Sequence, residues 1–275
     1  FWKRCRWMRD EAMAVRGAAI DLTGVSITLG NQEIVSAVDM HISAGEFVCL
    51  LGPSGCGKST ILNAIAGFLP VRGMISVAGV RVMGPGVDRG VAFQSTEALF
   101  PWLTARENVE YGPALKGVPA RERLDLAREY LDLVGLSAAA DKFPSELSGG
   151  MRQRLQIARV LVNQPSVVLM DEPFGALDAQ TREVMQKELD RIWRATKPTI
   201  LFVTHDIGEA ILLADVVLTM TTGPGARIKS VHRITLAHPR DETGSEALKF
   251  QAMLRAEIGE EVGKVLRQQG LRVTP

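Results

Sequence analysis

The sequence predicts an α/β fold in which a parallel sheet is joined by an antiparallel β subdomain and an inserted α-helical subdomain. Three continuous apolar runs, at 46–51, 166–170 and 199–204, have the length of buried strands. Helical segments separate them, and strands that alternate with helices are typical of parallel sheets. With 275 residues, 46% of them hydrophobic, the chain is long enough to bury a large core.

The amino-terminal part predicts an extension followed by antiparallel strands. Residues 1–17 are basic and aromatic near their start, and such a segment can dock on a membrane surface. Terminal arms are more often unstructured, so we expect a disordered N-terminal extension. From Ala18 to about Ser43, apolar and polar residues alternate, which indicates half-buried antiparallel strands.

The middle and the end of the chain are predicted to be helical. The pattern is helical from about residue 95 to residue 160, which suggests a helical subdomain inserted into a domain that spans 18–240. The segment 241–275 is charged, and we expect it to form a helical tail with a helix from Ser245 to Gln268.

Composition argues against several classes of protein. The formal net charge of +1 gives no general attraction to nucleic acid. The longest apolar stretch, from Ala210 to Met220, contains Asp215 and is too short to cross a membrane. The three cysteines, at positions 5, 49 and 56, have the spacing of neither a disulfide framework nor a zinc site. A reducing compartment is therefore expected.

A glycine-rich loop follows the first apolar run and matches the pattern G-x-x-x-x-G-K-[ST]. It consists of Gly52, Pro53, Ser54, Gly55, Cys56, Gly57, Lys58, Ser59 and Thr60. The glycines allow backbone N–H groups to turn inward around phosphate oxygens. Lys58 supplies charge to the β- and γ-phosphates, and Ser59 offers a hydroxyl ligand to Mg²⁺. A helix predicted over 60–68 points its positive end at the anion. The loop thus predicts a nucleoside triphosphate site.

An acidic pair follows the second apolar run. The strand would hold Asp171 at its carboxyl end, where the carboxylate can bind Mg²⁺ largely through water. If the strand pleat continues, Glu172 points the opposite way, and a carboxylate there can polarise an attacking water. His205 follows the third run, and by itself it reads best as an ordinary histidine at a strand end.

Five motifs, in the right order, resemble the set shared by ABC-type ATPases. They are Gln94 after Gly90-Val91-Ala92-Phe93, Leu147-Ser148-Gly149-Gly150, Asp171-Glu172-Pro173, Ala176-Leu177-Asp178 and Thr204-His205-Asp206. The resemblance covers roughly Ile20 to Arg240. It also makes His205 a candidate site residue and not an ordinary histidine at a strand end. It implies a P-loop NTPase core, ATP hydrolysis, and ATP with Mg²⁺ as cofactors.

The resemblance also implies a role for each residue. In the family, a segment like Ser148, Gly149 and Gly150 grips the γ-phosphate of the ATP on the other subunit, so that two ATPs are sandwiched head to tail. Asp178 would lie at that interface. The catalytic set that it implies is Glu172, His205, Gln94 and Lys58, and the implied Mg²⁺ ligands are Ser59, Gln94 and Asp171.

Three positions depart from the family or stand out. Met151 replaces a frequent glutamine, which removes a polar contact to the nucleotide of the partner site. Leu29 stands where the family has an aromatic residue that stacks on adenine, so we expect contact with the base without stacking, and weaker base selectivity. For Cys56 in the loop, a small filler is the plain interpretation. The sharper hypothesis is that nearby N–H groups and Lys58 lower its pKa and make it sensitive to alkylation.

Further segments resemble the nitrate, sulfonate and taurine importers, with the taurine importers closest. They are Gly84-Pro85-Gly86, Arg89–Gln94, Leu99-Phe100-Pro101-Trp102, Glu107-Asn108-Val109 and Gly223-Pro224-Gly225. The resemblance implies a homodimeric ATPase at the cytoplasmic face of the membrane. Its partners would be transmembrane permease subunits and, indirectly, a periplasmic or extracellular solute-binding protein, and no nucleic acid. The imported solute would be a small anion such as taurine, an alkanesulfonate or nitrate.

Two alternatives remain open from the sequence. Trp102 either docks a helix of the membrane domain or packs within the helical subdomain, because aromatic residues are common in both places. A soluble ABC ATPase that is not coupled to transport is the alternative function. Members of that kind typically carry a long coiled-coil insertion or tandem cassettes, and neither is visible in this sequence.

Overall fold

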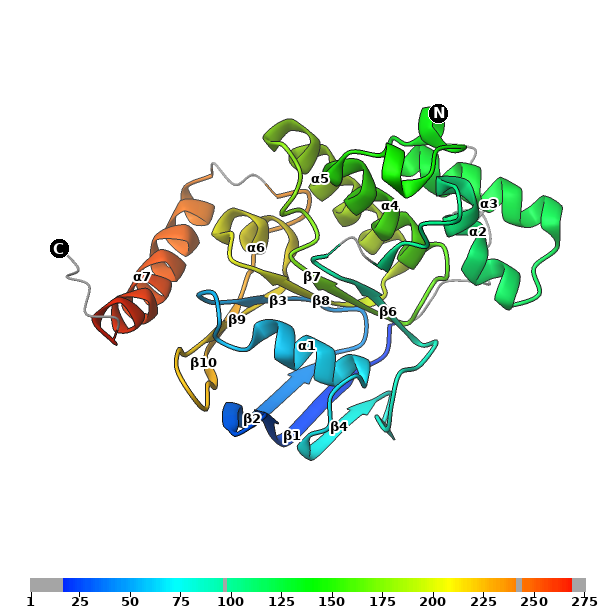
Figure 1. Cartoon of the computed structure of the whole chain (residues 1–275). Coiled ribbons are helices and arrows are strands. Elements are labelled where there is room, and N and C mark those ends of the chain that lie inside the picture. Colours follow the sequence, from blue (N-terminus) through cyan, green and yellow to red (C-terminus); the bar gives the residue numbers. More distant parts are fainter. Residues whose placement is uncertain (1–16, 96–97, 241–243, 269–275) are drawn as a thin grey trace. The chain divides into compact units, whose positions relative to one another are not determined.

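The computed structural model describes residues 17–95, 98–240 and 244–268 (Figure 1). The predicted extension 1–17 therefore lies, apart from Gly17, outside the described residues. The chain divides into two compact units. We call Val87–Lys197 the helical unit, and we call residues 17–86 together with the chain from Pro198 onward the sheet unit.

The sheet unit contains an antiparallel sheet at its amino-terminal side. Its strands are β1 (Ile20–Leu29), β2 (Gln32–Ile42), β4 (Arg72–Val77) and β5 (Val80–Arg81), in the order β2-β1-β4-β5. β1 pairs antiparallel with both β2 and β4. Its burial alternates because one face packs inward, and this confirms the antiparallel strands predicted from the alternating sequence.

Parallel strands form the other sheet of this unit. β3 (Phe47–Leu51) lies between β8 (Thr199–Thr204) and β9 (Val216–Met220) and is parallel to both, and β10 (Ile228–Arg233) pairs antiparallel with β9. Every residue of β3, β8 and β9 is buried, which explains their continuous apolar sequences. Helix α1 (Lys58–Ala66) contacts both β8 and β2, so it lies between the two sheets (Figure 1).

Two more helices complete the sheet unit. The short α6 (Ile207–Leu213) follows β8, and α7 (Ser245–Gln268) packs against α6. The bounds of α7 agree with the helix predicted from the sequence. Among the residues described, no helix combines the length and the apolar character needed to cross a bilayer.

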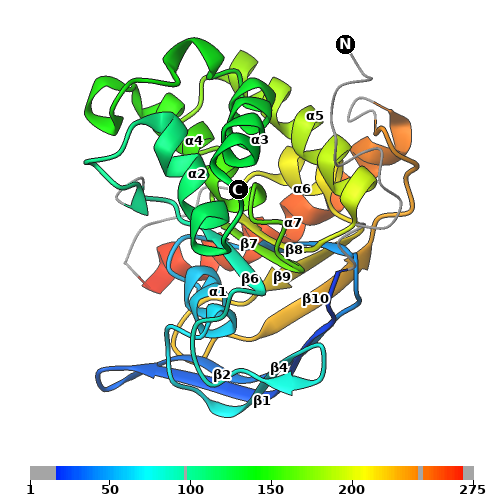
Figure 2. The same cartoon turned by 90° about the vertical axis from the view of Figure 1, so that its right-hand side faces the viewer.

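The helical unit is built on two parallel strands, β6 (Arg89–Ala92) and β7 (Val167–Asp171). Its helices are α2 (Ala105–Leu115), α3 (Ala120–Leu133), α4 (Gly149–Leu161) and α5 (Ala179–Thr196), with short 3₁₀ turns at Ser137–Ala139 and Pro144–Glu146. Helices α2, α3 and α4 contact one another and lie side by side in both views (Figures 1 and 2). They fall within the stretch that the sequence predicts as helical.

Candidate functional site

The phosphate loop leaves the buried end of β3 and enters α1. Gly55 and Gly57 have φ angles of 80° and 92°, a left-handed conformation that glycine adopts without steric cost. A Cβ on Gly52 would lie 2.8 Å from the Cys56 sulfur, so the loop also needs glycine there for space. The sequence motif therefore has a direct geometric cause.

Lys58 holds its charge inside this loop. Its side chain is 5% exposed, and the ammonium donates to the carbonyl oxygens of Gly52 at 2.6 Å and Pro53 at 2.9 Å. Ser54 and Ser59 of the same loop are exposed. A buried ammonium, glycines with a left-handed backbone and the amino end of α1 lie together in this loop, which we call the phosphate cradle because this combination suits phosphate groups.

The structure contradicts the hypothesis of a reactive Cys56. The thiol is buried, and its sulfur lies 3.8 Å from the Lys58 ammonium. Burial raises the pKa of Cys56, and the nearby charge of Lys58 and the backbone N–H groups lower it by less than burial raises it. The sequence places the cation correctly but does not reveal how completely the loop covers the sulfur.

His205 follows the strand next to the one that carries the phosphate loop. Strands β3 and β8 are parallel, with Leu51 opposite Thr204, so Gly52 and His205 leave the sheet at the same edge. The His205 side chain is exposed there. Below it, the Thr204 hydroxyl donates to the buried Glu209 carboxylate at 2.6 Å and accepts from Asp206 N–H at 3.0 Å, which fixes the turn.

The acidic pair stands at the end of β7 in the helical unit. Asp171 is the last residue of the strand and is 7% exposed. Glu172 does not continue the pleat, because its φ angle is 45° and the strand has ended. The prediction that Glu172 points opposite to Asp171 required a continuing strand pleat, and this condition is not met, because Glu172 lies in a left-handed turn after the strand.

Gln94 meets Glu172 in this unit. Ala92 of β6 pairs with Met170 of β7, and the two predicted site residues, Gln94 and Glu172, each follow two positions later. The Gln94 amide nitrogen donates to the Glu172 carboxylate at 3.2 Å. Two residues that are 78 positions apart in sequence are thus in direct contact.

The remaining predicted residues of the helical unit stand at helix starts. Ser148 is the N-cap of α4, and its hydroxyl accepts the N–H of Met151 at 3.2 Å. Asp178 is the N-cap of α5, and its carboxylate accepts the N–H of Thr181 at 3.0 Å, a bond that lowers the pKa of Asp178. Gly149 and Gly150 form the first turn of α4, as predicted, so their N–H groups stand at its positive end.

Leu29 ends β1 beside the β1–β2 turn, and 44% of it is exposed. The next strand passes behind the phosphate loop, because a Cβ on Gly57 would lie 3.0 Å from Val35. An aliphatic side chain is therefore presented to solvent on the same unit as the phosphate cradle.

Comparison with known proteins identifies the family. Residues 35–175 match the sequence model of a protein family described as ABC transporter. The uncharacterized ABC transporter ATP-binding protein MJ0412 of Methanocaldococcus jannaschii is 44% identical over 94% of this chain and 97% of its own length. The nitrate import ATP-binding protein NrtD of a Synechocystis strain is 45% identical over 86% of this chain and 90% of its own. The chain belongs to the ABC transporter family.

A solved structure agrees with this assignment. The ATP-binding cassette MJ0796, in a dimeric post-hydrolysis state bound to ADP and Pi, superimposes with a TM-score of 0.70 and 30% identity, covering 78% of this chain and 98% of that one. The predictions of the ABC ATPase fold and of the enzyme class are thereby confirmed. The chain is an ABC-type ATPase, and its relatives include a nitrate import protein, as the resemblance predicted.

The predicted Mg²⁺ ligands of this ABC ATPase fit the chemistry of that ion. They are a hydroxyl, a carboxylate and an amide oxygen, and hard oxygen donors are what Mg²⁺ prefers. In the described part of the chain, no group of three or more His, Cys, Asp or Glu residues could hold a metal by itself. The three predicted ligands, Ser59, Gln94 and Asp171, therefore suit an ion that is held by few protein ligands together with phosphate oxygens, as Mg²⁺ commonly is.

The motifs in the sequence do not point to one residue that contacts Glu172. Gln153, one turn after Gly150 on α4, donates to the carbonyl oxygen of Glu172 at 3.1 Å. Its helical spacing from Gly150 was the available signal, because residues three apart share a helix face.

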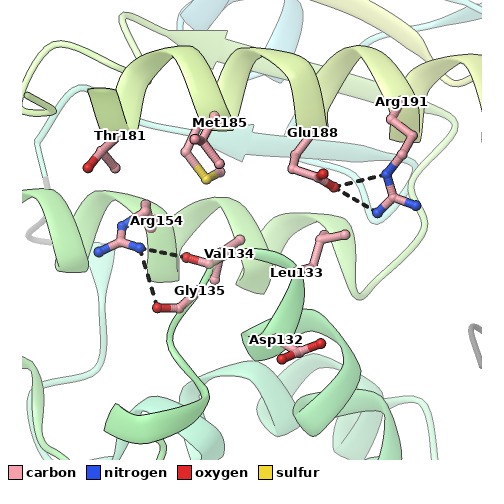
Figure 3. A pocket seen from close by; sticks show the side chains of 10 residues that line it. Asp132, Leu133, Val134, Gly135, Arg154, Thr181, Met185, Glu188 and Arg191 are labelled. Carbon is pink, nitrogen blue, oxygen red and sulfur yellow. Dashed lines mark hydrogen bonds and ion pairs between the residues drawn. The ribbon is translucent and has the colours of Figure 1, made fainter. Parts of the chain in front are cut away.

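Two cavities of the helical unit lie apart from the phosphate chemistry. One, of about 300 Å³, lies between the end of α3 and the helices α4 and α5 (Figure 3), and none of the predicted site residues lines it. The other, of about 210 Å³, lies beside β6 and includes Phe93, which precedes Gln94.

Proposed function

We propose that this ABC ATPase is the ATP-hydrolysing subunit of an importer for a small anionic solute. Two copies close head to tail around two Mg-ATP, closure drives the permease subunits, and hydrolysis reopens the dimer. The contact between Gln94 and Glu172 carries the proposal, since it joins a carboxylate suited to activate water to the residue that, in this proposal, reports to the transport partner.

The sheet unit supplies the positive groups in this proposal. Lys58 and the amino end of α1 bind the β- and γ-phosphates, and His205 holds the γ-phosphate from the neighbouring strand end. Ser59, together with Gln94 and Asp171 of the helical unit, would hold Mg²⁺, which would neutralise negative charge on the phosphates. Because the cradle is made mainly of backbone N–H groups and Lys58, grip on the nucleotide depends little on Met151 or Leu29.

The helical unit supplies the groups for the partner copy. The N–H groups at the start of α4, with Ser148, would contact the γ-phosphate bound by the other subunit, and Asp178 would lie at the same interface. The dimeric state of the solved cassette MJ0796 supports this arrangement.

The aromatic cluster formed by Phe100, Trp102 and Tyr111, which lie before and on α2, is the proposed contact with the permease. Trp102 is 69% exposed, and its ring lies 5.5 Å from that of Phe100, which is 4.5 Å from Tyr111. The Arg159 guanidinium lies 4.1 Å from the centre of the Phe100 ring and lines the cavity beside β6. Exposure of Trp102 favours docking over packing, and an aromatic and arginine surface is typical of interfaces.

The function of the cluster can be measured in transport. Trp102→Ala should uncouple solute uptake from ATP hydrolysis while ATP binding by the isolated subunit stays unchanged. Phe143→Ala, which removes another exposed aromatic of the helical unit, is the matched control and should leave uptake intact. Equal loss of ATP binding in the Trp102 variant would show that this ring serves the fold.

The solute is proposed from the relatives. A similar protein of Synechocystis is named as a nitrate import ATP-binding protein, which supports a small anion such as nitrate, taurine or an alkanesulfonate. The ATPase would then work at the cytoplasmic face of the membrane, bound to permease subunits that receive solute from a binding protein. Uptake of each anion by vesicles that contain the purified complex decides among them.

Substitution of the proposed catalytic carboxylate tests the hydrolysis mechanism. Glu172→Gln should retain ATP binding, accumulate an ATP-bound dimer in size-exclusion chromatography and lower turnover by about 10²- to 10⁴-fold, the usual contribution of a general base. Glu183→Gln on the exposed face of α5 is the control and should remain active. A Glu172→Gln variant with full turnover would refute the role of Glu172.

Comparing the turnover of GTP with that of ATP tests the proposed role of Leu29. A strong preference for ATP would mean that an aromatic residue elsewhere stacks on the base in place of Leu29.

A further inference from the structure

Glu172 has a backbone conformation that needs support. Its φ angle of 45° lies in the left-handed region, which residues other than glycine rarely adopt. The chain reverses here, directly after the last residue of β7. Such a conformation persists only where surrounding groups fix it.

A buried glutamine of α4 fixes this turn. Gln153 is 1% exposed, and its amide nitrogen donates to the Glu172 carbonyl oxygen at 3.1 Å. Its amide oxygen accepts the N–H of Ala176 at 2.9 Å. The N–H of Gly175 reaches the same Glu172 carbonyl at 3.1 Å. Gln153 therefore holds both ends of the turn with the two polar atoms of one side chain.

The bond to the carbonyl bears on the direction of the carboxylate. The peptide group is planar, so a carbonyl held from one side fixes the rotation of the backbone about the Cα–C bond. That rotation and φ together set the direction in which the Cα–Cβ bond leaves the chain. If Glu172 relaxed to the right-handed or extended region, its carboxylate would leave the Gln94 amide that it now meets at 3.2 Å.

The start of α4 contacts the same turn at a second point. A Cβ on Gly150 would lie 3.2 Å from the Leu177 side chain and 3.3 Å from the Ala176 carbonyl oxygen. The first turn of α4 is thus packed against residues that follow Glu172, and a side chain here would push them. The polar contact through Gln153 and the close backbone approach at Gly150 act on one segment.

We infer that Gln153 is a positioning residue for ATP hydrolysis, which keeps the Glu172 backbone left-handed so that its carboxylate is aimed toward Gln94 and the attacking water. This inference rests on the proposed catalytic role of Glu172. Gln153 touches neither nucleotide nor water in this role, and it acts through Glu172. A glutamine that served only to satisfy buried polar groups would support folding but would not affect turnover selectively.

Two variants of Gln153 separate these roles. Gln153→Met keeps the length and the approximate volume of the side chain and removes both hydrogen bonds. Gln153→Glu keeps an acceptor for the Ala176 N–H and removes the donor to Glu172. Both should lower kcat by about 10- to 100-fold, the size expected when a reacting group is displaced by about an ångström, while the KM for ATP changes by less than about twofold. Gln186→Met, at a buried glutamine of α5, is the matched control and should keep its kcat.

A double variant ties the effect to Glu172. In a Glu172→Gln background, adding Gln153→Met should lower the residual rate no further, because the carboxylate that Gln153 positions is already gone. A further fall of about tenfold in that background, or an equal fall for Gln186→Met, would overturn the inference. So would a normal kcat for Gln153→Met beside an inactive Glu172→Gln. If Glu172→Gln itself is active, the proposed mechanism fails first and independently.

A measurement on the unaltered chain covers the case in which the variants do not fold. The Ala176 N–H and the Gln153 side-chain amide protons should exchange slowly with solvent, because both hydrogen bonds are made by the buried Gln153 side chain. Exchange at the rate of free amides would show that the clamp is absent and would overturn the inference.

Discussion

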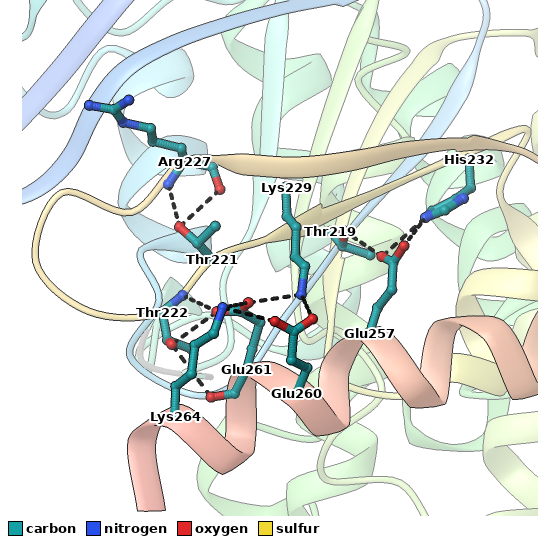
Figure 4. A network of polar contacts seen from close by, with 10 residues as sticks. All are labelled: Thr219, Thr221, Thr222, Arg227, Lys229, His232, Glu257, Glu260, Glu261 and Lys264. Atoms are coloured by element: carbon teal, nitrogen blue, oxygen red, sulfur yellow. Dashed lines mark hydrogen bonds and ion pairs between the residues drawn. The ribbon is translucent and has the colours of Figure 1, made fainter. Parts of the chain in front are cut away.

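Within the sheet unit, the contact of α7 with the segment that contains Thr222 and Lys229 involves one buried carboxylate, Glu261. Its side chain accepts hydrogen bonds from the Thr222 N–H at 2.9 Å and from the ammonium groups of Lys229 and Lys264 at 2.9 and 2.7 Å (Figure 4). Burial by itself would raise the pKa of Glu261, but the bonds from Lys264, Lys229 and Thr222 outweigh burial and lower the pKa to about 2. We predict that removal of this charge weakens the docking of α7.

The size of the effect follows from the shift. A fall from the ordinary value of 4.5 to about 2 corresponds to roughly 3 kcal/mol of stabilisation at neutral pH, at about 1.4 kcal/mol for each pKa unit. Since the pKa is lowered in the folded chain, this stabilisation is complete above about pH 5 and is lost as the pH falls toward 2. By about pH 4, roughly 1 kcal/mol should already be lost.

Glu261→Gln tests the prediction with little change in shape. Its free energy of unfolding in urea should be lower than that of the unaltered chain by up to about 3 kcal/mol at neutral pH, and the difference should shrink as the pH is lowered. Hydrogen exchange of peptides from α7 should rise in the variant. Glu260→Gln is the control, because Glu260 bonds to the same Lys229 and Lys264 but lies exposed, so its effect should be much smaller. A stability difference that is negligible, or that stays constant with pH, would refute the reasoning.

Three further predictions concern a buried amide, a glycine and a thiol. Asn108→Ala should lower the free energy of unfolding, measured with urea, by about 2–4 kcal/mol. The reason is that the fully buried Asn108 amide makes four hydrogen bonds to the backbone of the loop before α2. A loss of less than about 1 kcal/mol would contradict this prediction. Gly67→Ala should leave little folded protein, as judged by thermal melts, since the φ of Gly67 is 85° and the new Cβ would lie 2.2 Å from Gly84. Gly79→Ala, at a φ of 76° but in open space, should lower stability by only about 1 kcal/mol. Equal melting temperatures of the two variants would contradict this prediction. Iodoacetamide should modify Cys56 far more slowly than a small free thiol near neutral pH, because burial raises its pKa, and mass mapping that finds rapid labelling would refute the assignment.

The strands were predictable because the way each strand is buried determines its pattern of apolar residues. β3 and β8 are covered on both faces, so their sequences are continuously apolar, and the run predicted at 199–204 coincides with β8. β1 and β2 are half-buried, so their sequences alternate. The phosphate loop was predictable for a related reason, since a left-handed backbone at Gly55 and Gly57 restricts which residues can stand there.

The details that failed depend on contacts between distant segments. The pKa of Cys56 depends on how fully neighbouring groups cover the sulfur, which a motif does not contain. The direction of Glu172 depends on Gln153, which lies 19 positions before it and on another element. Residue type predicted that a carboxylate follows β7, but only the tertiary contact explains why a glutamate adopts a left-handed backbone there.

In the helical unit, residues with two kinds of proposed function lie on segments that are in direct contact. The start of α4 and the cap Asp178 are proposed to serve the nucleotide of the partner copy, whereas Glu172 is proposed to serve the nucleotide of its own copy. Gln153 and the close approach of Gly150 join α4 to the turn that contains Glu172 and leads to Asp178. Because the buried Gln153 side chain bonds to both ends of this turn, we expect a movement of α4 against the partner's nucleotide to alter the Glu172 backbone or break these bonds. In a head-to-tail dimer, hydrolysis at one site should therefore depend on closure at the other.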